Sequence, residues 1–115
     1  MKYMLLIYGN ESALQAASKA EGERRLAAYG AYTEALNKAG IRIDDNRLQR
    51  SSAASTVRVA DGKTQVLDGP YAEAKEQLGG YYLIDVPDLD AALSWAARCP
   101  GASHGTVEVR PIWTM

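Results

Sequence analysis

Two segments of this 115-residue sequence are apolar at nearly every position, and they constrain the fold more than any other feature. The first covers residues 3–8 and the second residues 81–86. A strand with one face in water alternates apolar and polar side chains, whereas a strand covered on both faces does not. We therefore expect both segments to be strands whose two faces are covered.

One long helix is predicted between these strands. It runs from about residue 23 to residue 39, and Gly40 follows in the position of a helix-terminating glycine. Residues 12–20 are predicted as a separate short helix, because Gly22 interrupts the pattern. The predicted apolar stripe of the long helix consists of Leu26, Tyr29, Thr33 and Leu36.

A β-hairpin and a second helix are also predicted. Asp61-Gly62 separates two segments that alternate in polarity, which is typical of a two-residue hairpin turn. Asp88 starts the second helix as its N-cap, and Pro100 stops it. The remaining predicted segments are an extended piece at 41–43, a turn at 44–46, a polar segment at 47–55, one or two helical turns at 72–77 and a last strand at 106–112.

This order of elements predicts an α+β ferredoxin-like sandwich with an inserted β-hairpin. The length suits one domain over residues 1–115. Two helices cover only one face of such a sheet, so the second face needs another cover. The simplest cover is the sheet of a second copy in a closed two-fold dimer. We therefore expect a homodimer that pairs as a dimeric α/β barrel.

Composition excludes several classes of protein. The formal net charge of −1 does not favour nucleic-acid binding. No segment approaches the roughly 20 apolar residues of a membrane span, and no signal peptide is recognised, so we expect a cytoplasmic protein without a membrane partner. Cys99 is the single cysteine, which excludes an internal disulfide and a zinc cluster of the usual kind. We expect no metal and no cofactor.

Asp68 and His104 are the candidate catalytic residues. Asp68 is a candidate general base, and the alternative is that its carboxylate caps the turn at Gly69-Pro70. His104 is the only histidine, and histidine is a common general acid or base. The alternative for His104 is an exposed loop residue, because a metal site needs several ligands.

Tyrosines and charged residues are the candidates for ligand binding. The chain has seven tyrosines and no phenylalanine, so much of its aromatic surface carries a hydroxyl group. The alternatives are ordinary packing for the tyrosines, a solvated surface for the charges at 75 and 76, and an ion pair across the dimer for the charges at 108 and 110. The candidates are Tyr29, Tyr32, Lys75, Glu76, Tyr82, Glu108 and Arg110.

Residues 68–82, Asp-Gly-Pro-Tyr-Ala-Glu-Ala-Lys-Glu-Gln-Leu-Gly-Gly-Tyr-Tyr, resemble the signature of YCII-related proteins of the DGPF type. Tyr71 stands where the usual residue is Phe. Residues 91–98 and 105–112 resemble the same family, whereas residues 44–55 depart from its pattern. The resemblance implies a dimeric α/β-barrel fold, in agreement with the argument from the two apolar strands.

The resemblance also implies several kinds of activity. Some YCII-type relatives carry a histidine on the first helix paired with an aspartate, and at least one is a dehydrochlorinase of a chlorinated aromatic. Tyr29 stands near that histidine position, and the predicted helix contains no histidine, so the pair does not carry over. DGPF-type proteins are also similar to products encoded beside extracytoplasmic-function sigma factors, which implies an accessory role.

We therefore interpret the chain as a homodimeric small-molecule-binding or accessory regulatory module. One alternative is a cofactor-free lyase, isomerase or dehydrochlorinase acting on a small cyclic or aromatic compound. Its titratable group would come from Asp68, His104 or Glu108. Another alternative is a protein-interaction partner of a sigma factor.

Overall fold

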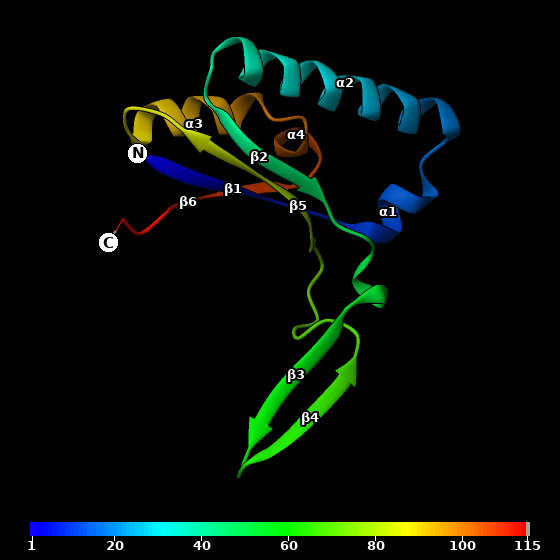
Figure 1. The fold of residues 1–115 in the computed structure, drawn as a ribbon. Coiled ribbons are helices and arrows are strands. Elements are labelled where there is room, and N and C mark those ends of the chain that lie inside the picture. The colour runs from blue at the N-terminus through cyan, green and yellow to red at the C-terminus, as the bar shows by residue number, and fades with distance from the viewer. Residues whose placement is uncertain (115) are drawn as a thin grey trace.

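Four strands form an antiparallel sheet in the order β2-β5-β1-β6. The computed structural model describes residues 1–114, and Figure 1 shows their arrangement. This order, with α2 and α3 as the two connecting helices, is that of a ferredoxin-like sheet and confirms the predicted fold class. The strands of the sheet are β1 (Lys2–Gly9), β2 (Arg42–Arg47), β5 (Gln77–Asp85) and β6 (Thr106–Pro111).

Helices cover one face of the sheet and leave the other face open (Figure 1). The two apolar segments became β1 and β5, the two central strands. Asp88 accepts a hydrogen bond from the Ala91 backbone at 2.9 Å, which confirms the predicted N-cap of α3. None of the helices within residues 1–114 is long and apolar enough to cross a membrane. The helices are α1 (Glu11–Ala16), α2 (Lys19–Lys38), α3 (Leu89–Arg98) and α4 (Gly101–His104), together with the 3-10 turn η1 (Ser51–Ala53).

The hydrophobic core lies between these helices and the sheet. Leu5 of β1, Leu36 of α2 and Ile84 of β5 have no exposed surface. Alternate side chains along β1 and β5 point into this core, because successive side chains of a strand face opposite sides. The full core consists of Tyr3, Leu5, Tyr32, Leu36, Tyr82, Ile84, Val86, Ala92, Ala96 and Cys99.

The predicted apolar stripe of α2 is wrong at its first position. Leu26 is 65% exposed, whereas the buried residues of this helix, Tyr32 and Leu36, both lie in its second half. The first half of α2 extends beyond the sheet (Figure 1), so periodicity alone could not show where the covering part of the helix begins. Gly40, with φ of 72°, ends the helix as predicted.

Two local predictions before β5 are also wrong. Residues 44–46 belong to β2 and not to a turn. Residues 72–76 form no helix, and Gln77 already begins β5. The side chain of Gln77 explains this start, since it accepts from the Glu11 backbone at 3.0 Å and donates to the Ala74 carbonyl. The short helix α4 was not predicted.

The predicted hairpin is present as β3 (Ser55–Ala60) and β4 (Lys63–Asp68). Asp61 and Gly62 have φ of 50° and 74°, as a two-residue turn of this kind requires. The two strands form a separate sheet that projects away from the rest of the chain (Figure 1).

Candidate functional site at strand β2

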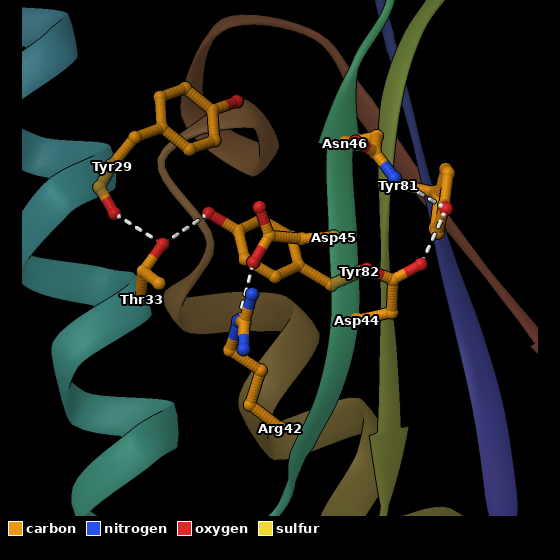
Figure 2. A network of polar contacts seen from close by, with 8 residues as sticks. All are labelled: Tyr29, Thr33, Arg42, Asp44, Asp45, Asn46, Tyr81 and Tyr82. Atoms are coloured by element: carbon orange, nitrogen blue, oxygen red, sulfur yellow. Dashed lines mark hydrogen bonds and ion pairs between the residues drawn. The ribbon is translucent and has the colours of Figure 1, made fainter.

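A group of polar side chains lies where β2 and β5 meet α2, and Figure 2 shows it from close by. On the helix-covered side it contains Thr33 from α2, Arg42 and Asp45 from β2, and Tyr82 from β5. We call these four residues the polar seam. A buried tyrosine hydroxyl, a hydroxyl on the helix and an ion pair therefore share one edge of an otherwise apolar layer.

The two hydroxyl groups of the polar seam have fixed roles. The oxygens of Thr33 and Tyr82 are 2.7 Å apart, and Thr33 also donates to the Tyr29 carbonyl at 2.9 Å. A threonine hydroxyl has one proton, so Tyr82 must be the donor in its bond with Thr33. The lone pairs of the Tyr82 oxygen then remain available to accept a hydrogen bond from another group.

An ion pair forms the outer part of the polar seam. Arg42 Nε donates to Asp45 Oδ2 at 2.5 Å, and the two side chains are 31% and 28% exposed. The hydrogen bond and the charge of Asp45 raise the pKa of Arg42. Within residues 1–114, the two side chains are joined by one hydrogen bond, from Nε of Arg42 to Oδ2 of Asp45. The second carboxylate oxygen and the terminal guanidinium nitrogens therefore keep free hydrogen-bonding capacity among the described residues.

Buried tyrosines lie behind the polar seam. The rings of Tyr32 and Tyr82 meet edge to face with centroids 5.2 Å apart, and the Tyr32 hydroxyl donates to the Trp95 carbonyl at 2.7 Å. Burial raises the pKa of Tyr29, Tyr32 and Tyr82 above the ordinary value for tyrosine. These phenols therefore stay protonated near neutral pH and act as hydrogen-bond donors or acceptors, not as bases.

Cys99 is close to the same tyrosines and is 1% exposed. Burial raises the pKa of its thiol, which removes the thiolate that nucleophilic chemistry would need. Cys99 therefore acts as a small core residue.

A second polar group lies on the opposite face of the same two strands (Figure 2). The Tyr81 hydroxyl donates to Asp44 Oδ2 at 2.8 Å and accepts from Asn46 Nδ2 at 2.8 Å. Tyr81 and Tyr82 are consecutive in β5, so their side chains point to opposite faces of the sheet. Tyr81 belongs to the open face, and Tyr82 belongs to the polar seam.

The structure brings three of the predicted ligand-binding residues together. Tyr29, Tyr32 and Tyr82 line the layer between α2 and the sheet, and the Tyr29 hydroxyl lies against Gly101 at the start of α4. Only the main-chain carbonyl of Tyr29 takes part in the polar seam.

The predicted charged residues lie elsewhere. Glu108 and Arg110 form an ion pair with each other, within one chain, on the open face. Val107 and Val109 pack on the core, which agrees with the predicted orientation of β6. Glu76 accepts a hydrogen bond from Thr106 at 2.8 Å. Lys75 is exposed.

The two predicted catalytic residues are exposed and are not joined to the polar seam by a hydrogen bond in the described chain. His104 ends α4, and Asp68 ends β4 at the base of the hairpin. Within residues 1–114 the Asp68 carboxylate makes no hydrogen bond with the following turn. Instead, the backbone N–H of Gly69 donates a hydrogen bond to the Ala54 carbonyl at 2.7 Å, which stabilises that turn.

The sequence did not reveal the carboxylates at this site, because residues 44–46 resembled a turn. A polar strand is typical of a sheet edge, where one side of the strand remains in water. The signal was therefore present in the polar run that follows the extended piece at 41–43. The site residues missed in this way are Thr33, Arg42, Asp44, Asp45, Asn46 and Tyr81.

The ferredoxin-like sheet and its two covering helices define a class of small α+β domains, and comparison with known proteins gives the family. The chain belongs to the family of the YCII-related domain, whose model matches residues 1–115. An uncharacterized protein of Rhizobium meliloti (strain 1021) is 44% identical over 114 residues, which are 97% of this chain and 92% of that protein. The predicted family is therefore confirmed.

One solved structure similar to this chain is 5-chloro-2-hydroxyhydroquinone dehydrochlorinase from Burkholderia phenoliruptrix AC1100, in complex with 2,5-dihydroxybenzoquinone. The TM-score is 0.54 with 18% sequence identity, over 99% of this chain and 94% of that chain. At this identity the likeness shows a shared fold.

Proposed function

We propose that this chain binds a small hydroxylated cyclic compound at the polar seam. The observation that carries the proposal is the unused hydrogen-bonding capacity of the buried Tyr82 hydroxyl and of the half-buried Arg42–Asp45 pair beside it. Core layers are normally apolar, and ligand sites combine apolar walls with a few placed polar groups. The seam has this composition, with the rings of Tyr32 and Tyr82 as its wall.

The polar groups match the hydroxyl and carbonyl groups of such a ligand. Asp45 and the Tyr82 oxygen accept hydrogen bonds from ligand hydroxyls, and the terminal nitrogens of Arg42 donate to a ligand carbonyl or phenolate oxygen. The solved structure of similar fold holds 2,5-dihydroxybenzoquinone, a compound of this class, which supports the choice of probe.

Thermal unfolding with 2,5-dihydroxybenzoquinone, hydroquinone and catechol tests this site. Ligand at about 100 times its Kd stabilises the native state by about 2.7 kcal/mol, which raises the Tm by several degrees. Tyr82→Phe should abolish the shift, because it removes an acceptor that the ligand uses. Asp45→Asn should strongly reduce it, because it replaces a charged acceptor by a neutral amide. Tyr81→Phe, one residue away on the opposite face, is the matched control and should keep it. A shift that survives Tyr82→Phe and Asp45→Asn but disappears in Asp68→Ala would contradict the seam and favour the base of the hairpin.

A cofactor-free lyase, isomerase or dehydrochlorinase is the second candidate function. The observation that favours it is the Asp45 carboxylate, whose cross-strand neighbour is the protonated phenol of Tyr82. A carboxylate can take a proton from a bound hydroxylated ring, and the terminal guanidinium nitrogens of Arg42 can donate to the oxygen on which negative charge develops. Asp45 would then be the general base, with Asp68, His104 and Glu108 as the candidates predicted from the sequence.

Chloride release from 5-chloro-2-hydroxyhydroquinone, followed with a chloride electrode, tests this second function. The wild-type protein should release chloride above the uncatalysed rate, and Asp45→Asn should reduce that rate by about 100-fold or more, the scale of a general base. Tyr81→Phe should retain the wild-type rate. A rate that is unchanged in Asp45→Asn but lost in Asp68→Ala or His104→Ala would contradict a role of Asp45 as the general base. It would favour the residues that were predicted from the sequence.

We also propose a homodimer in which the open faces of two sheets pack together. Met4, Leu6 and Leu83 lie at the centre of the open face, on the strand positions that alternate with the buried core residues. In the isolated chain these three side chains are only partly covered. An antiparallel sheet that ends in water normally carries polar side chains on its outer face.

Sedimentation velocity tests the dimer at protein concentrations 10 to 100 times below and 10 to 100 times above about 10 μM. This range is chosen because standard interfaces reach micromolar affinity or better. Leu6→Asp should shift the protein to a monomer, because it places a charge in the centre of the paired faces. Leu26→Asp, at a position that is 65% exposed on α2, is the control and should remain a dimer. A wild-type protein that sediments as a monomer throughout would rule out the pairing.

A sigma-factor partner is a third proposal, for the accessory role. Exposed apolar side chains on the hairpin, such as Val59 at 65% exposure, support a protein partner of some kind. The sigma-factor proposal predicts that the two proteins form a stable complex when they are co-expressed.

A further inference from the structure

The β3–β4 hairpin, residues 55–68, stands apart from the body of the chain as an arm (Figure 1). The Cα radius of gyration is 16.1 Å, whereas a compact chain of this length has about 13 Å. The principal extents of 48, 45 and 18 Å describe a flat molecule with two long directions. The arm accounts for this departure from a compact shape.

One face of the arm is apolar. Val57 pairs with Val66 and Val59 pairs with Thr64, and directly paired residues share a face. The three valines are 61%, 65% and 60% exposed in the order 57, 59 and 66. The opposite face carries Arg58 and Gln65 at its centre. We call Val57, Val59 and Val66 the valine face.

The arm cannot be stable in isolation with its valine face in water. A two-stranded hairpin alone is at best marginally stable, and it needs a third strand or packing against another element. Its connection to the body is at its base, where Gly69 donates to the Ala54 carbonyl at 2.7 Å and Thr56 donates to the Gly69 carbonyl at 2.9 Å. The valine face therefore requires a partner outside the single chain.

A second copy of this chain is the partner that the geometry fits. The arm projects from the side of the sheet opposite α2 and α3, which is the side of the open face (Figure 1). A copy that packs on the open face therefore lies beside the arm. In a two-fold pair each arm lies along the other copy, which can then cover its valine face.

The area of the open face also bears on whether the arm contributes to the dimer interface. Four strands about 4.8 Å apart, each with about six paired residues at about 3.3 Å, give a face of about 400 Å². A standard stable interface buries about 800 Å² per partner. The arm adds the exposed surface of its valine face on the same side.

We propose that the β3–β4 arm is a clasp that lies along the partner protomer, with its valine face against that protomer. This inference rests on the homodimer proposed above and adds the element that stabilises it. The clasp makes the arm's own folding depend on association, because the partner covers the three exposed valines of the hairpin.

The test compares two sets of substitutions by sedimentation equilibrium. Val57→Ser, Val59→Ser and Val66→Ser together remove the valine face and should raise the dimer Kd by about 100-fold or more. Arg58→Ser with Gln65→Ser changes the opposite face of the same strands and should change the Kd by less than threefold. Since the valine variant could simply unfold its hairpin, hydrogen exchange of residues 56–67 in the wild-type protein provides a second measurement.

Arm amides that are protected above the dimer Kd and exchange freely below it support the clasp. A dimer with rapidly exchanging arm amides and an unchanged Kd in the valine variant would overturn the clasp and leave the homodimer standing. A wild-type monomer would overturn both. A monomer whose arm becomes protected only with a co-expressed sigma factor would replace the second copy by that partner.

Discussion

Leu36→Ala is expected to lower the free energy of unfolding by about 2–5 kcal/mol, whereas Leu26→Ala on the same helix changes it by less than about 0.5 kcal/mol. Leu36 has no exposed surface and lies in the core between α2 and the sheet, so its truncation leaves a cavity there. Leu26 is 65% exposed, and alanine is the better helix former.

Urea unfolding followed by circular dichroism measures both changes at neutral pH. Domains of this size have about 5–15 kcal/mol of stability, so the loss at Leu36 removes a large fraction of it. Equal losses at the two positions would mean that the first half of α2 is also covered, for example by a second copy. Repeating the Leu26→Ala measurement at several protein concentrations separates cover by a second copy, which depends on concentration, from cover within the single chain, which does not.

A steep loss of stability above pH 10 is the second large effect that we expect. Burial raises the pKa of Tyr29, Tyr32 and Tyr82 in the folded chain, whereas in the unfolded chain these phenols ionise at about pH 10. The stabilisation by these raised values is fully present below pH 10. It is lost as the pH rises from there toward the folded values, because the folded state then holds three more protons than the unfolded state.

Each phenol that stays protonated in the folded chain while it ionises in the unfolded chain adds up to about 1.4 kcal/mol per pH unit to the slope. The raised pKa of the Cys99 thiol adds in the same direction from about pH 8.5, where an unfolded cysteine titrates. Urea unfolding between pH 9 and pH 11.5 measures the slope. Tyr82→Phe should reduce the slope, and Tyr71→Phe, at a side chain that is 77% exposed, should leave it unchanged. A flat profile through this range would show that the three phenols are in contact with water.

The fold could be predicted because its strongest signals are local. The two mainly apolar segments, the Asp61-Gly62 turn and the Asp88 cap each depend on a few adjacent residues, and all three kinds of signal appear in the structure where expected. The wrong predictions depend on distant contacts. The end of the sheet determines that Leu26 remains exposed, and hydrogen bonds of Gln77 with Glu11 and Ala74 favour a strand where a helical turn was expected.

The candidate site was only half predictable for the same reason. Tyrosines at positions 29, 32 and 82 were selected for their chemistry, and the fold places them together. Arg42 and Asp45 enter the site only because β2 pairs with β5, and no feature of a short polar segment specifies that pairing. The predicted roles of Asp68 and His104 stay predictions, for which the variants described above provide the test.

The irregular pairing of β2 has a consequence for how such chains diversify. The register between β2 and β5 shifts between Arg42 and Asp44, and after this bulge Asp45 opposes Tyr82 while Asp44 opposes Leu83. Successive strand residues face opposite sides, so inserting or deleting one residue in this short stretch would exchange the two aspartates between the faces. A single codon gained or lost there would therefore exchange which aspartate lies on the helix-covered face and which lies on the open face, without altering either side chain. Length variation at this point of the gene thus changes the position of each carboxylate while the scaffold stays the same.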